Sequence, residues 1–458
     1  MAPPDPVAAF IDAACVPLDA GHATGGLEAA NAVLATHPHV ASASVHTAAV
    51  LGDDAAVRRF LAADPAAATA AGGPRGWDAL THLCFSRYLR LDPTRSDGFV
   101  RAATALLDAG ADANTGWREP NHQPYPTRES AIYGAAGVAH HAGLTRLLLE
   151  RGADPNDDET PYHAPEGYDL AALAALVESG KLTADSLATM LLRKADWHDH
   201  DGVKYLLAHG AEANRLTRWG YTALHQAVRR DNALETVELL LDHGADPALP
   251  NTLDGRSAAA LAARRGRGDV LAALDLRGVA VGLAGVERLI AACARDDAVT
   301  VGSIAAAEPG LVAEVVAMGG TLLAEFAGNG NTAGVGRLLD LGVPVGAVYR
   351  EGDGYFGIAP DSTALHVAAW RSRPETVKLL IARGAAVDAA DGHGRTPLML
   401  AVKACVDSYW TERRTPESVA ALLAAGASAA GVAWPCGYGE VDELLGRRQQ
   451  AGGGPDNR

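Results

Sequence analysis

Apolar residues along this chain recur at the spacing of short paired helices. A clear example is residues 363–387, TALHVAAWRSRPETVKLLIARGAAV, which contain two stretches with helical periodicity. The apolar positions are Leu365, Ala368 and Ala369 in the first stretch, then Val377, Leu379 and Leu380 in the second. Thr363 can cap the first helix, and Gly384 can adopt the left-handed conformation that ends the second. The pattern therefore predicts a helix–turn–helix unit.

The end of this unit, leucines followed by a glycine, recurs along most of the chain. It reads LLDAGADAN at 106–114, LLLERGADPN at 147–156, YLLAHGAEAN at 205–214, LLLDHGADPA at 239–248 and LLIARGAAVD at 379–388. One pair of short helices cannot bury its apolar face alone, so successive units must stack on one another. We therefore predict an all-α helix–turn–helix solenoid of about eleven repeats, with helical caps and loop insertions.

These residues resemble the ankyrin repeat, whose hallmark is Thr-Pro-Leu-His followed by Ala-Ala and later by Leu-Leu-x-x-Gly-Ala-Asp. Matching stretches are TALHQAV at 222–228, TALHVAA at 363–369, TPLMLAV at 396–402 and TPYH at 160–163. The resemblance covers roughly residues 40–430. It implies an ankyrin-type solenoid that holds a protein or peptide in its concave groove. It also implies that His46, His225 and His366 tie neighbouring repeats together through hydrogen bonds.

We expect four parts along the chain. Residues 1–40 form an N-terminal helical cap, and residues 431–458 form a C-terminal cap with a disordered tail. Between the caps lie a first repeat array at 41–278 and a second at 279–430, because LIAACARDDAVTVGSIAAAEP at 289–309 aligns without gaps on residues 45–65. This division predicts a bend or a weaker junction at 279–288.

Aromatic residues make up only 5% of the chain, yet several of them fall in four insertions at 86–98, 115–129, 346–361 and 404–417. The rings in these insertions are Tyr88, Trp117, Tyr125, Tyr349, Tyr355, Phe356, Tyr409 and Trp410. Rings on exposed loops are effective interface anchors, so we predict a binding role for those from Trp117 onward, together with Tyr133, Tyr168 and Trp197. The alternative is that the rings fold back and cover the insertions themselves.

Histidines gather between residues 122 and 200, in the region where the repeat is least regular. They favour an alternative hypothesis, a metal or acid–base site built across several repeats. The predicted catalytic residues of that site are His163, His198, His200, Tyr162 and Asp199. Its predicted metal ligands are His122, His163, His198 and His200, with a divalent metal as cofactor. Because repeats stack about 8–10 Å apart, distant ligands converge only through long loops, and a solvated polar surface is the competing interpretation.

Arginines recur at equivalent places in two successive repeats. They are Arg229 and Arg230 in one, then Arg264, Arg265 and Arg267 in the next. Stacking would align them into a positive patch on an acidic protein, so Arg230 and Arg265 are predicted to bind an acidic partner segment. Solvated turn residues are the alternative.

Charge and composition limit the classes of function. A net charge of −16 disfavours binding to nucleic acid. The five cysteines are too far apart for a disulfide framework, so we expect a reducing cytoplasm. The start of the chain lacks a signal peptide, and no long apolar run indicates a membrane segment. Arginine outnumbers lysine 34 to 5, which favours a bacterial source with a high-GC genome.

Standard catalytic motifs are missing from the sequence, since no HExxH, GxSxG or phosphate-binding GxxxxGK[ST] occurs. The main prediction is therefore a monomeric, cytoplasmic protein-binding scaffold without a cofactor, which uses its concave groove and aromatic insertions. Two alternatives stay open. One is an enzyme or metal-binding protein with a His/Tyr/Asp site at 115–200, and the other is a small-molecule binder in the same region.

Overall fold

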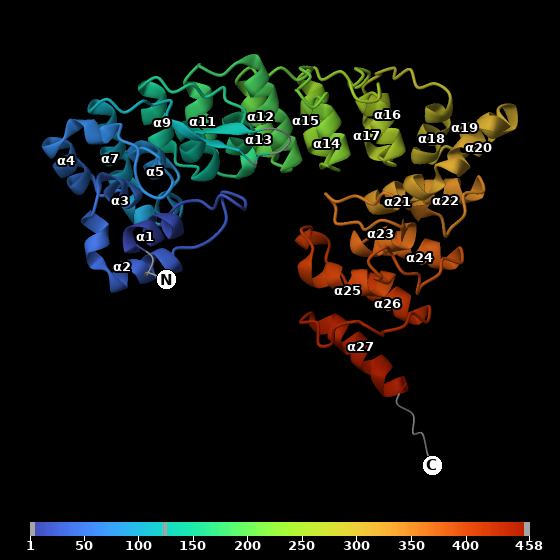
Figure 1. Cartoon of the computed structure of the whole chain (residues 1–458). Helices are drawn as coiled ribbons and strands as arrows, with labels where there is room; N and C mark the ends of the chain where they lie inside the picture. The colour runs from blue at the N-terminus through green and yellow to red at the C-terminus, as the bar shows by residue number, and fades with distance from the viewer. Residues whose placement is uncertain (1–4, 121, 123–125, 453–458) are drawn as a thin grey trace, which may run out of the picture. The chain divides into compact units, whose positions relative to one another are not determined.

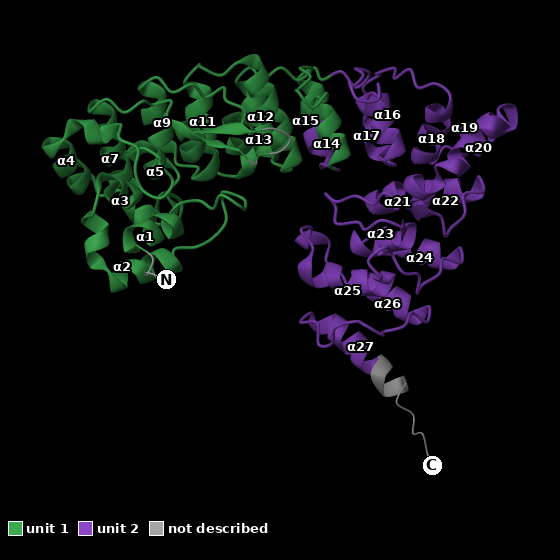
Figure 2. Cartoon of the chain, viewed as in Figure 1, with its two compact units in different colours: residues 1–230, 239–245 green, residues 231–238, 246–458 purple. Residues whose placement is uncertain are grey.

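The computed structural model of the chain describes residues 5–120, 122 and 126–452, with side chains through residue 447. Its described residues form short α-helices that follow one another in pairs, together with two hairpins of two strands each (Figure 1). The predicted all-α solenoid of helix pairs is confirmed. The chain separates into two compact units (Figure 2).

Unit 1 covers residues 1–230 and 239–245. Its helices are α1 (Pro6–Ala14), α2 (Glu28–Thr36), α3 (Val45–Val50), α4 (Asp54–Ala63), α5 (Ala79–Cys84), α6 (Arg87–Leu91), α7 (Ser96–Asp108), α8 (Ala131–Tyr133), α9 (Ala142–Glu150), α10 (Thr160–His163), α11 (Ala171–Glu178), α12 (Ala184–Asp196), α13 (His200–Ala208) and α14 (Ala223–Arg229). Strands β1 (Gly116–Glu119) and β2 (Thr127–Ser130) pair antiparallel. Short 3₁₀ helices are η1 (Pro38–Ser42), η2 (Pro65–Ala68), η3 (Pro93–Arg95) and η5 (Ala164–Glu166), and η4 (Gly134–Val138) is π-helical.

Unit 2 covers residues 231–238 and 246–458, and α15 (Leu234–Asp242) contributes to both units. Its other helices are α16 (Ala258–Arg264), α17 (Gly268–Leu276), α18 (Val286–Ala294), α19 (Ala298–Ala307), α20 (Pro309–Ala317), α21 (Gly319–Asn329), α22 (Thr332–Asp340), α23 (Ala364–Trp370), α24 (Pro374–Ala382), α25 (Pro397–Asp407), α26 (Glu417–Ala424) and α27 (Gly439–Gly452), with η6 (Thr411–Arg413). Strands β3 (Val348–Tyr349) and β4 (Ser362–Thr363) pair antiparallel, and β4 directly precedes α23 in the sequence.

The turn between the two helices of a repeat uses one left-handed residue. This position is held by Gly52, His140, His198, Asp231, Gly266, Asp296, Gly330 and Ser372, whose φ angles lie between 49° and 75°. The following residue often caps the second helix, as Asp53 does by accepting from the Ala56 N–H at 2.9 Å. His140 and His198 therefore occupy positions that the repeat itself defines.

Repeats are joined by the histidine of the Thr-x-Leu-His motif. His366 Nδ1 lies 2.8 Å from Thr363 Oγ1 at the start of α23, and its Nε2 donates toward the carbonyls of Ala389 and Arg395 at 2.9 and 3.1 Å. The last two residues precede α25, so His366 links one repeat to the next as predicted. Ala368 and Ala369 behind it are fully buried, because small side chains let neighbouring helices approach closely.

The boundary between the two units falls at residues 230–246. The predicted junction at 279–288 lies inside unit 2 and stays a prediction. No single described helix is long and apolar enough to cross a membrane. Helices α19 and α20 meet that test only when they are taken together, and they are bent by 109°.

Candidate functional site

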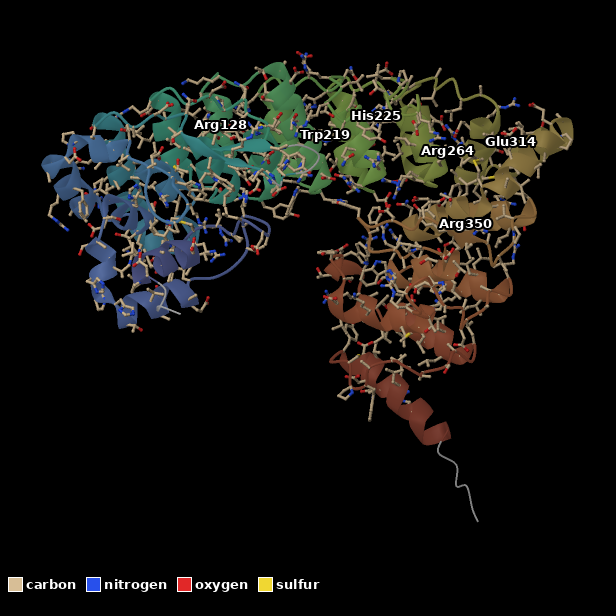
Figure 3. The ribbon with its side chains drawn as sticks, in the orientation of Figure 1. Arg128, Trp219, His225, Arg264, Glu314 and Arg350 are labelled. Carbon is tan, nitrogen blue, oxygen red and sulfur yellow. The ribbon has the colours of Figure 1, made fainter. Side chains whose placement is uncertain are left out.

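The hairpin β1–β2 places an aromatic residue beside a buried acid. Trp117 on β1 pairs in register with Glu129 on β2, so the two side chains emerge on the same face of the hairpin. Glu129 is fully buried and Trp117 is 9% exposed. Arg128, which is labelled in Figure 3, is the exposed neighbour of Glu129, as the alternation of a strand requires.

Three further rings form the wall around this pair. Trp77 stacks on Trp117 with ring centroids 5.0 Å apart, and Phe85 meets the edge of Trp117 at 6.0 Å. Tyr133 lies 5.9 Å from Phe85. Trp77, Phe85 and Tyr133 come from the turn before α5, from the end of α5 and from α8. They are all buried.

Tyr133 is positioned by the π-helix that follows it. Gly137 in η4 lies so close to the tyrosine ring that a Cβ atom there would be 2.7 Å from Tyr133 Cδ2 and 3.0 Å from His163 Cβ. Only glycine leaves room for both side chains. Single π-helical turns of this kind are frequent at functional sites.

A loop from the N-terminal cap completes the cluster. Residues 15–27 connect α1 to α2, and we call residues 16–27 the strap. His22 of the strap lies 5.7 Å from the ring of Trp117 and 5.8 Å from that of Tyr133. Its Nδ1 is 2.8 Å from the Tyr133 hydroxyl and 3.9 Å from Glu129 Oε2. Burial lowers the pKa of His22, which favours the neutral imidazole. We call Trp77, Phe85, Trp117, Glu129 and Tyr133, with His22 inserted, the Glu129 site.

Glu129 is buried in this site without hydrogen bonds from the described residues to its carboxyl group. Neither carboxylate oxygen has a hydrogen-bond partner among the described residues, and the same is true of the Trp117 indole N–H. Burial, followed by the nearby carboxylates of Glu159, Asp157 and Glu119, raises the pKa of Glu129 to about 8. The acid is therefore largely protonated near neutral pH.

A second group of charges lies beside the Glu129 site. His163 Nε2 is 3.1 Å from Glu159 Oε2, and His163 Nδ1 is 3.0 Å from Glu166 Oε2. Burial opposes the positive charge of His163, but the two acids outweigh it and raise its pKa to about 9. Glu166 also pairs with Arg193, whose guanidinium lies 3.9 Å from the centroid of the Tyr162 ring. His163 is thus a fixed cation within an ion-pair network.

Several predicted site residues meet in this part of unit 1. His163, Tyr162, Trp117 and Tyr133 belong to the two groups above, and His122 Nε2 lies 3.6 Å from Glu159 Oε1. Tyr162 also contacts Trp219, labelled in Figure 3, at 5.3 Å between centroids. Tyr125 lies outside the described residues.

Other predicted catalytic and metal-binding residues lie elsewhere. Asp199 caps α13 through the Gly202 N–H and pairs with the fully buried Lys194 at 2.7 Å. His198 holds the left-handed turn position, and His200 begins α13. Among the described residues, no three His, Cys, Asp or Glu side chains form a group that could hold a metal ion. His163 lies in the ion-pair network and His198 and His200 lie at the turn before α13, and the prediction that the three share one site stays a prediction.

Sequence reasoning missed His22, Glu129, Glu166 and Arg193. His22 lies in the predicted N-terminal cap, far from residues 115–200, and no local pattern links it to them. Glu129 does carry a local signal. It follows Thr127 at strand spacing in TRES, where an inward-facing acid is unusual.

In unit 2 the predicted binding rings divide into buried and exposed ones. Phe356 is 5% exposed, and it covers the guanidinium of Arg371 at 4.1 Å, beside Trp410 at 4.7 Å. Tyr349 is half-buried. Tyr355 and Tyr409 are 41% and 90% exposed. Phe356, and in unit 1 Trp117 and Tyr133, are buried, which agrees with the alternative that these rings fold back, and their binding role stays a prediction.

Arg265 is not part of a free positive patch. It is buried, and it binds both oxygens of the buried Asp231 at 2.8 Å and Glu325 Oε2 at 2.9 Å. Arg371 also donates to Asp231 at 3.1 Å. In unit 1, Arg230 pairs with Asp196 at 2.6 Å. Arg230 and Arg265 are thus paired with carboxylates from other repeats, and their role in binding an acidic partner stays a prediction.

Two of the rings that are predicted to bind are exposed in unit 1. Tyr168 is 69% exposed and Trp197 is 39% exposed, and the Tyr168 hydroxyl donates to the Trp197 carbonyl at 3.1 Å. A surface cavity of about 570 Å³ is lined by residues that include His140, His141 and Asp169, next in sequence to Tyr168.

The stacked helix pairs, the left-handed turns and the linking histidines define a helical repeat protein. The family model described as ankyrin repeats, three copies, matches residues 187–280 and 323–428. These two segments of the chain are ankyrin repeats. The chain is 28% identical over 174 residues to Rabankyrin-5 of Mus musculus. This alignment covers 33% of this chain and 15% of the mouse protein. Rabankyrin-5 of Homo sapiens matches with the same identity and coverage. The chain thus spans a small part of the length of these relatives. Ankyrin repeats generally mediate protein–protein interaction.

Proposed function

We propose that the protein is a protein-binding scaffold and that the Glu129 site is one of its binding sites. The observation that carries the proposal is the buried Glu129 carboxylate, whose oxygens have no hydrogen-bond partner among the described residues, behind a wall of aromatic rings. A buried polar group without a partner costs free energy, so such a group is retained where a ligand completes it. Large rings around it supply the apolar contact area typical of binding hot spots.

The electrostatics of this region favour recognition over acid–base catalysis. His163 carries a pKa of about 9 and has carboxylates on both ring nitrogens, so it holds its proton at neutral pH. A general base must be unprotonated at the working pH so that it can accept a proton from the substrate. His22 is neutral, but its Nδ1 is engaged with the Tyr133 hydroxyl.

A serine–histidine pair in the surface cavity of unit 1 also lacks the arrangement of a nucleophile. Ser96 Oγ lies 2.6 Å from His141 Nε2. His141 Nδ1 accepts the Leu144 backbone N–H at 3.0 Å, so the proton of the neutral imidazole sits on Nε2 and is donated to Ser96. A base that activates serine must instead accept from it. The pair instead fixes the start of α7.

Site-specific photo-crosslinking tests the proposal in the cells from which the protein comes. A crosslinker replaces Leu18, which is 45% exposed on the strap, and a control crosslinker replaces Leu276, which is 89% exposed at the end of α17. We expect a protein partner to be crosslinked from position 18 and not from position 276. The crosslink should persist in Glu150→Gln, an exposed acid on α9, and decrease in Glu129→Gln. A crosslink that is equal in both variants would argue against the site.

A further inference from the structure

We propose that the Glu129 site receives an arginine side chain of the partner protein, which takes the place of His22. The inference rests on the proposed function, and it adds the chemical identity of the group that is bound. It follows from three features of the site: the free carboxylate, the flat ring that now occupies the site, and the way the strap is attached.

The carboxylate offers the acceptor that an arginine requires. Both oxygens of Glu129 are buried and lack hydrogen-bond donors among the described residues, so the two can accept the parallel N–H groups of one guanidinium. The charge around it is mainly negative. The groups facing it are His22 of the strap, Glu119 of β1, Tyr133 of α8, Asp157 and Glu159 before α10, and His163 of α10. A positive group would therefore be stabilised there.

The present occupant indicates the shape of the ligand. The His22 imidazole is a flat ring between Trp117 and Tyr133, with centroid distances of 5.7 and 5.8 Å. A guanidinium is also flat and stacks favourably on aromatic faces, whereas an ammonium is a compact, strongly hydrated charge. The site therefore favours arginine over lysine.

The strap is attached in a way that allows its middle to leave. Its beginning is held by the Val16 N–H, which donates to Phe85 O at 3.0 Å, and by Arg75, which donates to Val16 O at 2.7 Å. Its end is held by Arg90, which donates to Gly25 O at 3.3 Å. Between these points residues 18–25 are exposed apart from His22. His22 can thus withdraw while α1 and α2 stay in place.

Arginine binding should release a proton. Glu129 has a pKa of about 8 in the free protein, and a guanidinium beside it would favour the ionised acid. Affinity should therefore rise with pH, by up to roughly 25-fold between pH 6.5 and pH 8.5 if the bound acid stays ionised throughout. His163, with a pKa of about 9, keeps its charge over most of this range.

The probe is ethylguanidinium, an arginine side-chain mimic, titrated into the full chain at constant ionic strength. The reporter is the NMR signal of the Trp117 indole N–H, assigned by its loss in Trp117→Phe. We expect a saturable shift whose dissociation constant decreases with pH. Glu129→Gln should weaken binding by about tenfold or more and remove the pH dependence, and Glu150→Gln should leave both unchanged. His22→Ala, which removes the occupant, should bind the probe more tightly.

Three outcomes would overturn the inference. One is equal affinity in the protein and in Glu129→Gln, another is weaker binding in His22→Ala, and the third is tighter binding of n-butylammonium than of ethylguanidinium, which would indicate lysine. These outcomes leave the proposed function standing if the crosslink from position 18 still depends on Glu129. Loss of that dependence would count against the proposed function itself.

Discussion

The His22 imidazole lies 3.9 Å from the Glu129 carboxylate, and it hydrogen-bonds to the Tyr133 hydroxyl rather than to the acid. The strap therefore fills the site without supplying the donors that Glu129 would accept from a ligand. We therefore expect that a ligand can displace His22 from the Glu129 site, and the attachment of the strap is the first property to test.

Removal of the Tyr133 hydroxyl should loosen the strap. Tyr133→Phe deletes the hydrogen bond to His22 and keeps the ring packing, so the change costs about 1 kcal/mol. Limited proteolysis between residues 18 and 25 should then become about fivefold faster. The matched control is Tyr168→Phe, which deletes a hydroxyl whose hydrogen bond goes to a backbone carbonyl. Equal cleavage rates in the two variants would mean that His22 does not anchor the strap.

The buried acid should make unit 1 less stable as pH rises. Glu129 has a pKa of about 8 when folded, above its ordinary value, so between roughly pH 4.5 and pH 8 the unfolded chain has lost a proton that the folded protein retains. Folding is therefore penalised increasingly across this window, and the penalty is constant above pH 8. Glu129→Gln removes it.

We expect the melting temperature of Glu129→Gln to exceed that of the unsubstituted protein by an amount that grows from pH 5 to pH 8. Differential scanning calorimetry measures this difference. Glu150→Gln, on the exposed side of α9, should show a difference that does not change with pH. A constant offset for Glu129→Gln as well would show that its carboxyl titrates normally.

The acid at the turn before α15 should be essential to unit 2. Asp231→Asn leaves the left-handed turn tolerable but removes the charge that compensates Arg265 and Arg371. Breaking a buried ion pair in this way costs about 3–5 kcal/mol. Urea denaturation should show the loss.

Asp296→Asn is the matched control for this change. Asp296 holds the equivalent left-handed position two repeats later. It is half exposed, and it pairs with Arg337 at the surface. Its substitution should change stability by less than about 1 kcal/mol. Similar losses in both variants would mean that the turn conformation, and not the buried charge, sets the stability.

The Phe356 ring should fix the conformation of the insertion at 346–361. Phe356→Ala exposes the Arg371 guanidinium and removes a buried side chain, at a cost of about 3–5 kcal/mol. Tyr355→Ala, at the neighbouring exposed position, should cost less than about 0.5 kcal/mol. Hydrogen exchange over residues 352–358 should rise sharply in the first variant only. If both variants exchange alike, the insertion is not fixed by Phe356.

Local chemistry explains why part of the candidate site could be predicted. The irregular stretch 115–200 indicated where His163, Tyr162, Trp117 and Tyr133 would gather, because insertions and a broken helix at Pro165 leave the repeat pattern there. His198 holds the left-handed position of a repeat turn, which glycine or aspartate holds in several other repeats, and its role as a ligand stays a prediction.

The sequence by itself determined the helix pairs, the glycine at the end of each repeat and the linking role of His366, because these depend on contacts within one repeat or between successive ones. The tertiary structure decided which charges are compensated. Arg265 is buried beside Asp231 and Glu325, whereas Glu129 has no hydrogen-bond donor among the described residues although His22 of the distant N-terminal cap lies next to it. Burial and charge pairing depend on residues that are remote in sequence, and no local pattern encodes them.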